Sequence, residues 1–527
     1  FGSTFGTFNA ANAGDVAITS TGAITSDNIT TLLDAADGEL EIQGTSGVIA
    51  TLGLSIGVHA DGGTNIVLGD IASGTEASTL KVVAAAAALT VDPLIKTLNA
   101  QIVGSILVQD STAGAEGDLV TFNGIIGGGA ANIIDTIQIG DADEVSGNAK
   151  FTADVKATAI AVEGGDASEN STADFASTVT GAITMDDVAS KGNATVIFSG
   201  TTRTIAATVT GQAAGDGTVQ VTGTGLTLNG AIGATGIGTL DIDATAAMTA
   251  VADAEVVNIA TGQTFTIDDA FTGDATTLAG TGGITFSTDA DGAATTAIVA
   301  VINGAADGDG TLTYTNTAQS TQTGAVGTTN GIGTIAVGAS GLIDMVGVVD
   351  TQSLTVLAGG VISFDDDATH DAAVLTTTGK IMYEEDGDGA AVATSTGTID
   401  GVASENGVIQ TNNGSTVTFA DNIGSTQSLL TMTLTTQATF NGDVRSKAIT
   451  TAQSQVNDFN GDLTVGATKF IITGAAGEAM FSGAGDQTVT GEIVGAGAEQ
   501  GVIDNANTAG TVTFASAQGT VELKEVE

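Results

Sequence analysis

The chain lacks cysteine and tryptophan, and its 527 residues include one proline and two tyrosines. The absence of cysteine excludes disulfides, thiolate catalysis and cysteine-ligated metals. The scarcity of proline suits short strands, because proline has no N–H group to donate to a β-ladder. Two tyrosines and no tryptophan leave little material for the aromatic platforms on which enzymes bind sugars. These absences argue against thiolate chemistry and against a sugar-cleaving groove.

Basic residues are also scarce, with 11 Lys and Arg against 60 Asp and Glu, which gives a formal charge of −49. Such a surface repels nucleic acid and anionic membranes and attracts cations. Only 13% of the residues are charged and 42% are hydrophobic, so we expect a folded chain rather than a disordered acidic one. The longest apolar run, residues 82–89, is far shorter than the ~20 residues of a membrane-spanning helix. We therefore expect no nucleic-acid partner and no membrane span.

The chain is instead rich in glycine, with 75 residues, which lie between short segments of alternating apolar and polar residues. In "TLTYT", Leu312 and Tyr314 alternate with threonines, and turn pairs such as "NG", "DG" and "GG" interrupt these segments after four to eight residues. This pattern predicts an all-β fold with little helix. One short helix is predicted over residues 92–102, where Asp92 would cap the N-terminus and Pro93 would occupy the first helical position.

Phenylalanine recurs in a nearly constant setting, as in "ATFNG" and "NDFNG". In the C-terminal part the spacings are 21, 19, 22 and 33 residues, between Phe419, Phe440, Phe459, Phe481 and Phe514. A strand that ends in a buried Phe and a turn, repeated about every 20 residues, is typical of a β-solenoid or of tandem β-sandwiches. The single proline favours the solenoid. In that case Phe440 and Phe459 should be stacked about 4.8 Å apart, and otherwise they should lie well apart.

The length exceeds the ~250–300 residues that one compact core can reach, so we expect several regions or a fold that grows in one dimension. Composition suggests four regions: residues 1–110, β-rich with the short helix; 111–363, a central β-repeat region; 364–390, an acid-rich insertion or boundary; and 391–527, a C-terminal repeat region with the ~20-residue Phe period.

Acid clusters give the strongest chemical signal. Two of them lie about one coil apart, and stacking would merge them into one patch of oxygen ligands for Ca²⁺: Asp365, Asp366 and Asp367, then Glu384, Glu385, Asp386 and Asp388. The alternative is that they are ordinary solvated turn residues. The two histidines, His59 and His370, have no second histidine or nucleophile motif nearby, so we interpret them as solvated loop residues. No catalytic residue is identified, and the chain is not expected to be an enzyme.

Phrases such as "VTFNG", "TGAITMDD" and "LTVGATKFIITG" resemble the Gly/Thr/Asn-rich strand repeats of bacterial surface proteins, namely surface-layer proteins and autotransporter passenger domains. The resemblance implies an extracellular or cell-surface location. The opening "FGSTFGTF", without an initiator methionine, fits a mature secreted product. Because the sequence stops at "GTVELKEVE", we expect a processed passenger domain, or a surface-layer or appendage subunit, rather than an intact autotransporter.

These observations predict a secreted structural protein that assembles with itself into a cell-surface layer, sheath or filament, helped by divalent cations. Unpaired strand edges at the ends of a coil stack would join subunits. The first alternative is an adhesin or processed passenger domain that binds host cells, a cell-surface glycan or lipopolysaccharide. The second alternative is a polysaccharide-degrading β-helix enzyme with paired carboxylates.

Overall fold

The computed structural model describes strands alone between residues 16 and 97, and then residues 104–110, 119–128, 132–141, 145–165, 169–187, 192–287, 297–384, 392–412, 416–519 and 523–526. The chain divides into two compact units, residues 1–258 and 259–527. Each unit is described by itself.

The strands of the first unit are β1 (Val16–Ser20), β2 (Ile29–Thr31), β3 (Glu39–Gly44), β4 (Leu54–Ile56), β5 (Asn65–Leu68), β6 (Thr79–Ala84), β7 (Leu89–Val91), β8 (Leu94–Thr97), β9 (Ser105–Asp110), β10 (Leu119–Phe122), β11 (Ile134–Ile139), β12 (Asn148–Phe151), β13 (Val155–Glu163), β14 (Ser171–Phe175), β15 (Val179–Asp186), β16 (Ala194–Phe198), β17 (Thr204–Ile205), β18 (Thr208–Gly211), β19 (Asp216–Val221), β20 (Leu226–Leu228), β21 (Ile232–Ile242), β22 (Ala246–Met248) and β23 (Ala252–Ile259), which ends at the boundary.

Those of the second unit are β24 (Thr264–Ile267), β25 (Phe271–Leu278), β26 (Gly283–Phe286), β27 (Ala297–Gly304), β28 (Asp309–Tyr314), β29 (Ser320–Gln322), β30 (Ile332–Val337), β31 (Leu342–Met345), β32 (Val349–Val356), β33 (Val361–Phe364), β34 (Ala368–Leu375), β35 (Lys380–Tyr383), β36 (Val392–Gly401), β37 (Val408–Thr411), β38 (Thr416–Phe419), β39 (Thr431–Leu434), β40 (Ala438–Phe440), β41 (Val444–Thr451), β42 (Val456–Phe459), β43 (Leu463–Ile472), β44 (Glu478–Phe481), β45 (Gln487–Thr490), β46 (Ile493–Gly495), β47 (Val502–Asn505), β48 (Val512–Phe514) and β49 (Glu525–Val526).

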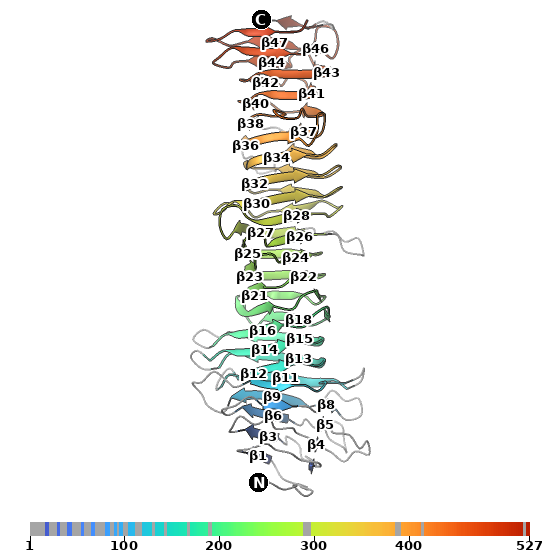
Figure 1. Ribbon diagram of the computed structural model, residues 1–527, viewed down its shortest axis with the longest axis vertical. Coiled ribbons are helices and arrows are strands. Elements are labelled where there is room, and N and C mark those ends of the chain that lie inside the picture. Colours follow the sequence, from blue (N-terminus) through green and yellow to red (C-terminus); the bar gives the residue numbers. More distant parts are fainter. Residues whose placement is uncertain are drawn as a thin grey trace. The chain divides into compact units, whose positions relative to one another are not determined.

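Each unit is a parallel β-solenoid, in which each strand pairs with the equivalent strands of the turns before and after it (Figure 1). Such runs of parallel, in-register pairs occur in both units, for example β12–β14–β16 in the first and β31–β33–β35 in the second. Sandwich domains are built from antiparallel sheets. The predicted all-β solenoid is therefore confirmed, and the tandem-sandwich alternative is wrong.

A typical turn consists of a four-residue strand, an exposed corner and a longer strand with an exposed middle. In β34 the side chains alternate between inside and outside, two neighbouring residues are exposed, and the alternation then resumes. The pairing register between β34 and β36 shifts at this point, between Thr369 and Ala372. Because side chains alternate with period two, the shift lets one long strand contribute inward residues on both sides of a bend.

Within the largely aliphatic core, aromatic side chains stack from turn to turn. Phe440 and Phe459 are paired in register, are 1% exposed, and have ring centroids 4.9 Å apart with an interplanar angle of 12°. Phe419 continues the stack at 5.0 Å from Phe440. The same arrangement occurs in the first unit, where Phe122 and Phe151 are 5.1 Å apart. The sequence-derived prediction for Phe440 and Phe459 is confirmed.

The corners after these aromatic strands are held by side chains that cap the next turn. Asn422 Oδ1 accepts a hydrogen bond of 2.7 Å from the Asp443 N–H, and Asp443 Oδ1 accepts one of 2.9 Å from the Asp462 N–H. Asp462 Oδ1 then accepts one of 2.7 Å from the Thr488 N–H. In the repeated phrase "FNGD", the Phe therefore lies in the core, and the Asp at the corner accepts a hydrogen bond from a backbone N–H of the next turn.

The predicted helix over residues 92–102 is wrong where the structure describes it. Leu94–Thr97 forms β8, which pairs in parallel with β5. Its side chains alternate, with Ile95 and Thr97 buried and the two others half-buried, so the strand period describes this segment better than the helical one. Asp92 lies outside the described residues. In the part of the chain that the structure describes, no helix has the length and apolar character needed to cross a membrane.

Candidate functional site

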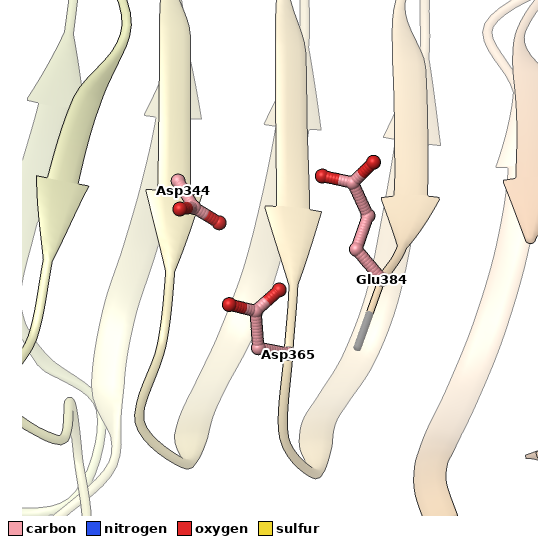
Figure 2. Close-up of side chains that lie close together, drawn as sticks. All are labelled: Asp344, Asp365 and Glu384. Atoms are coloured by element: carbon pink, nitrogen blue, oxygen red, sulfur yellow. The ribbon is translucent and has the colours of Figure 1, made fainter. Parts of the chain in front are cut away.

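Three carboxylates meet on one outer face of the second unit. They belong to Asp344, Asp365 and Glu384, and one oxygen of each lies within 4.8 Å of those of the other two. Figure 2 shows the side chains coming from three neighbouring strands and gathering over the space between them. All three residues are half-buried.

The solenoid pairing brings these residues together. Met345 of β31, Phe364 of β33 and Tyr383 of β35 are paired in register. Asp344 immediately precedes the first of these core residues, and Asp365 and Glu384 immediately follow the other two. Consecutive strands of a sheet lie about 4.8 Å apart, so Asp365 and Glu384, at equivalent positions, become direct neighbours. Asp344 pairs with Ser363, two residues before Asp365, and lies diagonally from it.

Neighbouring polar groups orient two of the carboxylates. The Ser363 hydroxyl donates to Asp344 Oδ1 at 3.2 Å, and the Asn412 amide donates to Glu384 Oε1 at 3.0 Å. Three carboxylates at this separation repel one another by about 1 kcal/mol per pair in a water-like medium and by more in a lower dielectric. A bound cation would relieve that repulsion, and oxygen ligands of this kind suit Ca²⁺.

The structure brings together two of the predicted cation ligands, Asp365 and Glu384. It gives two others a different role, because Asp366 Oδ1 accepts the Asp367 N–H at 2.7 Å and Asp367 Oδ1 accepts the Thr394 N–H at 2.7 Å. Asp366 thus satisfies its own chain neighbour, and Asp367 caps a backbone group of the next turn. The remaining predicted ligands, Glu385, Asp386 and Asp388, lie outside the described residues.

Asp344 was missed by the sequence reasoning. It stands in "GLIDM", one turn before Asp365, as a single acid within an alternating strand rather than as a member of an acid cluster. The offset between paired residues of β31 and β33 is 19, so one repeat before Asp365 lies Val346, whereas Asp344 pairs with Ser363. Neither the period nor the local acid density therefore indicated Asp344.

His370 is buried, which makes its interpretation as a solvated residue wrong. Its side chain is 2% exposed on β34, and neither ring nitrogen has a hydrogen-bond partner. It pairs with Thr351 of β32, and on the other side a Cβ on Gly397 would lie 2.6 Å from its Nδ1. Burial lowers the pKa of His370 to about 4, although Asp421 and Asp371 act in the opposite direction. His59 lies outside the described residues.

Both tyrosines of the chain are core residues. Tyr314 is 0% and Tyr383 is 1% exposed, and Tyr383 donates a hydrogen bond of 2.7 Å to the Ser395 hydroxyl. Burial raises the pKa of both phenols well above the ordinary value. Since the chain has no tryptophan, neither Tyr nor Trp offers an aromatic surface for stacking sugars.

The fold defines the chain as a parallel β-solenoid protein with a three-carboxylate cluster on one face. No protein-family model, no curated protein and no solved structure matches it.

Proposed function

We propose that the chain is a secreted structural subunit that assembles with itself into a layer, sheath or filament on a cell surface. The observation that carries this proposal is that the recurring aromatic and acidic residues of the repeat have structural roles. The aromatic residues stack inside, and corner acids such as Asp443 and Asp462 cap backbone groups of the next turn. A repeat built in this way provides rigid, regularly spaced faces, which suit a scaffold.

Divalent cations have a defined role in this proposal. Subunits of formal charge −49 repel one another, and the cluster of Asp344, Asp365 and Glu384 offers carboxylates that Ca²⁺ can bridge. Cation binding at the cluster removes negative charge from one face and allows closer approach of a second subunit.

Electron microscopy of the native cell surface with and without a chelator tests the proposal. We expect an ordered layer, sheath or filament that loosens in excess chelator at low ionic strength. An assembly that stays intact under these conditions would contradict the cation role. A protein that stays monomeric with Ca²⁺ while binding host cells, glycan or lipopolysaccharide would instead indicate an adhesin and contradict the scaffold.

A further inference from the structure

Two adjacent outward rows in the second unit are rich in threonine and contain no charged side chain. They are formed by residues of β24, β26, β28, β30 and β32 along the pairing register, and the outward acids Asp309 of β28 and Asp350 of β32 lie outside the two rows. The first row is Thr264, Gly283, Thr311, Thr334 and Ser353, and the second is Thr266, Thr285, Thr313, Ala336 and Thr355. We call these ten residues the threonine face; Figure 1 shows their strands as successive layers.

The alternation of the strands fixes the orientation of this face. The residues between the two rows, such as Phe265, Leu312 and Ile335, are fully buried, and most residues of the rows are half-buried. The next strand, β34, continues the rows with Ala372 and Val374. The charge-free surface ends at β36, where Asp400 pairs with Val374.

Outward positions on other strands of this unit do carry charge. Asp344 and Lys380 occupy them on β31 and β35, and Asp458 and Glu478 occupy them on β42 and β44. On a chain with a formal charge of −49, contacts between such charged faces bring carboxylates together, whereas a contact between two threonine faces does not. Juxtaposed like charges cost several kcal/mol, so electrostatics favours the threonine face over the charged faces for contact between copies.

The chemistry of the rows also suits a second copy. Successive strands are about 4.8 Å apart, so the rows of two identical faces share one spacing and stay in register along their length. Threonine is β-branched and loses little side-chain freedom on burial. Interdigitated rows of such side chains make dry contacts between paired sheets.

We infer that the threonine face is the contact through which one copy of this chain packs against the threonine face of a second copy. The inference rests on the proposed self-assembly and assigns a surface to it. The strands from β24 to β34 span about 24 Å, a short contact compared with standard protein interfaces. A single pair is therefore weak, and the contact gains strength where many copies form an array.

Substitution at Thr313, in the middle of the second row, tests the inference. Thr313→Asp and Thr313→Lys each place two like charges opposite each other in a face-to-face pair. The matched control is Thr433→Asp, an outward, half-buried threonine on β39 whose row neighbours are Gln410 and Thr450. Sedimentation velocity over a concentration series, with and without Ca²⁺, measures association, and circular dichroism checks folding.

We expect both Thr313 variants to require at least tenfold more protein than wild type to associate, while Thr433→Asp behaves like wild type. Stronger association of Thr313→Lys would overturn the inference, because it would mean that the threonine face meets an acidic face. Equal behaviour of the Thr313 and Thr433 variants in an assembling protein would overturn the inference and leave the proposed function intact. A wild-type protein that never associates, or whose threonine face binds ice or a crystalline polysaccharide as a monomer, would overturn both.

Discussion

At the scale of single residues, His370 is an exception among its equivalents. Thr351 and Ser446 occupy the same position, third in the long strand, and each donates its hydroxyl to a carbonyl two residues later, to Ser353 O at 3.2 Å and to Ala448 O at 2.9 Å. His370 instead places an imidazole without hydrogen-bond partners in the core. A buried polar group that is left unpaired destabilises the fold, and it does so more strongly when it becomes charged.

We predict that His370 makes its turn sensitive to acid. Its pKa is about 4 in the folded chain and 6.5 in the reference state, so the unfolded chain binds the proton more tightly. Stability is therefore fully present above pH 6.5 and falls as the pH drops toward 4, by an amount of the order of 3 kcal/mol. Hydrogen exchange of the β34 amides at pH 7.5 and pH 4, corrected for the intrinsic rates, should show this loss.

The variant His370→Thr provides the control, since it copies the residue found one turn earlier. The acids that act on the imidazole are Asp371, on β34 itself, and Asp421 after β38, whose carboxylate accepts the Gly397 N–H at 2.8 Å. The neighbouring strands carry Asp350 on β32 and Asp400 near the far end of β36. Burial, with Asp307 and Asp371, raises the pKa of Asp350, so it titrates in both proteins. An equal acid response of wild type and variant would assign the effect to these carboxylates and refute the role of His370.

The residues show why the site was only partly predictable from the sequence. Asp365 and Glu384 were found because acids gather around them, and their distance in sequence matched one coil. Asp344 and His370 were missed or misjudged because their environment depends on the register between turns. His370 was interpreted as solvated because no second histidine or nucleophile motif lies nearby in the sequence, whereas strand alternation places the histidine inside and the adjacent Asp371 outside.

At the scale of elements, the aromatic stack joins one strand to the next within the core. We predict that Phe440→Ala destabilises the second unit by about 3–5 kcal/mol, because it removes a fully buried ring and its contacts with rings on both sides. Chemical denaturation followed by circular dichroism measures the loss.

The matched control is Phe440→Leu, which keeps most of the apolar volume and should cost about 1.5 kcal/mol or less. The first unit shows that an aliphatic residue can continue such a column, since Phe198 pairs with Val221. A loss of equal size in both variants would mean that ring stacking, rather than filled volume, holds the turns together.

The carboxylate cluster links three strands, and a matched pair of variants tests whether it binds a cation. Asp365→Asn and Asp366→Asn remove one charge from neighbouring positions, but only Asp365 belongs to the cluster. We expect Asp365→Asn to weaken Ca²⁺ binding at least tenfold in isothermal titration calorimetry, and Asp366→Asn to change it little. Equal effects of the two variants would indicate diffuse attraction to the acidic surface instead of a site.

Most of the fold could be predicted at this scale because the signals for each strand and turn lie within a few neighbouring residues of the sequence. Alternation marks the strands, glycine and asparagine mark the turns, and the spacing of Phe440 and Phe459 gives the length of a turn. The segment at residues 94–97 was misassigned because Asp92-Pro93 imitates a helix start, while the pairing with β5 that makes it a strand is a contact distant in sequence. The choice between solenoid and sandwich likewise depended on pairing that composition does not encode.

At the scale of the whole molecule, the formal charge of −49 dominates how copies approach one another. Salt shortens the range of this repulsion from about 30 Å at 0.01 M to about 3 Å at 1 M. A contact through an uncharged face then needs no specific ion, whereas a contact bridged by the carboxylate cluster needs a divalent one. The two contributions to assembly are therefore separable by the kind of salt added.

We predict that 1 M NaCl in the presence of a chelator promotes association of wild type and of Asp365→Asn equally, because screening acts on all carboxylates. Millimolar Ca²⁺ in 0.01 M NaCl should promote association of wild type and much less that of Asp365→Asn. Light scattering against salt concentration for both proteins measures these responses, with Asp366→Asn as the charge-matched control. If association depends on ionic strength alone, whichever ion supplies it, the carboxylate cluster has no role in assembly. Screening would then explain the whole effect.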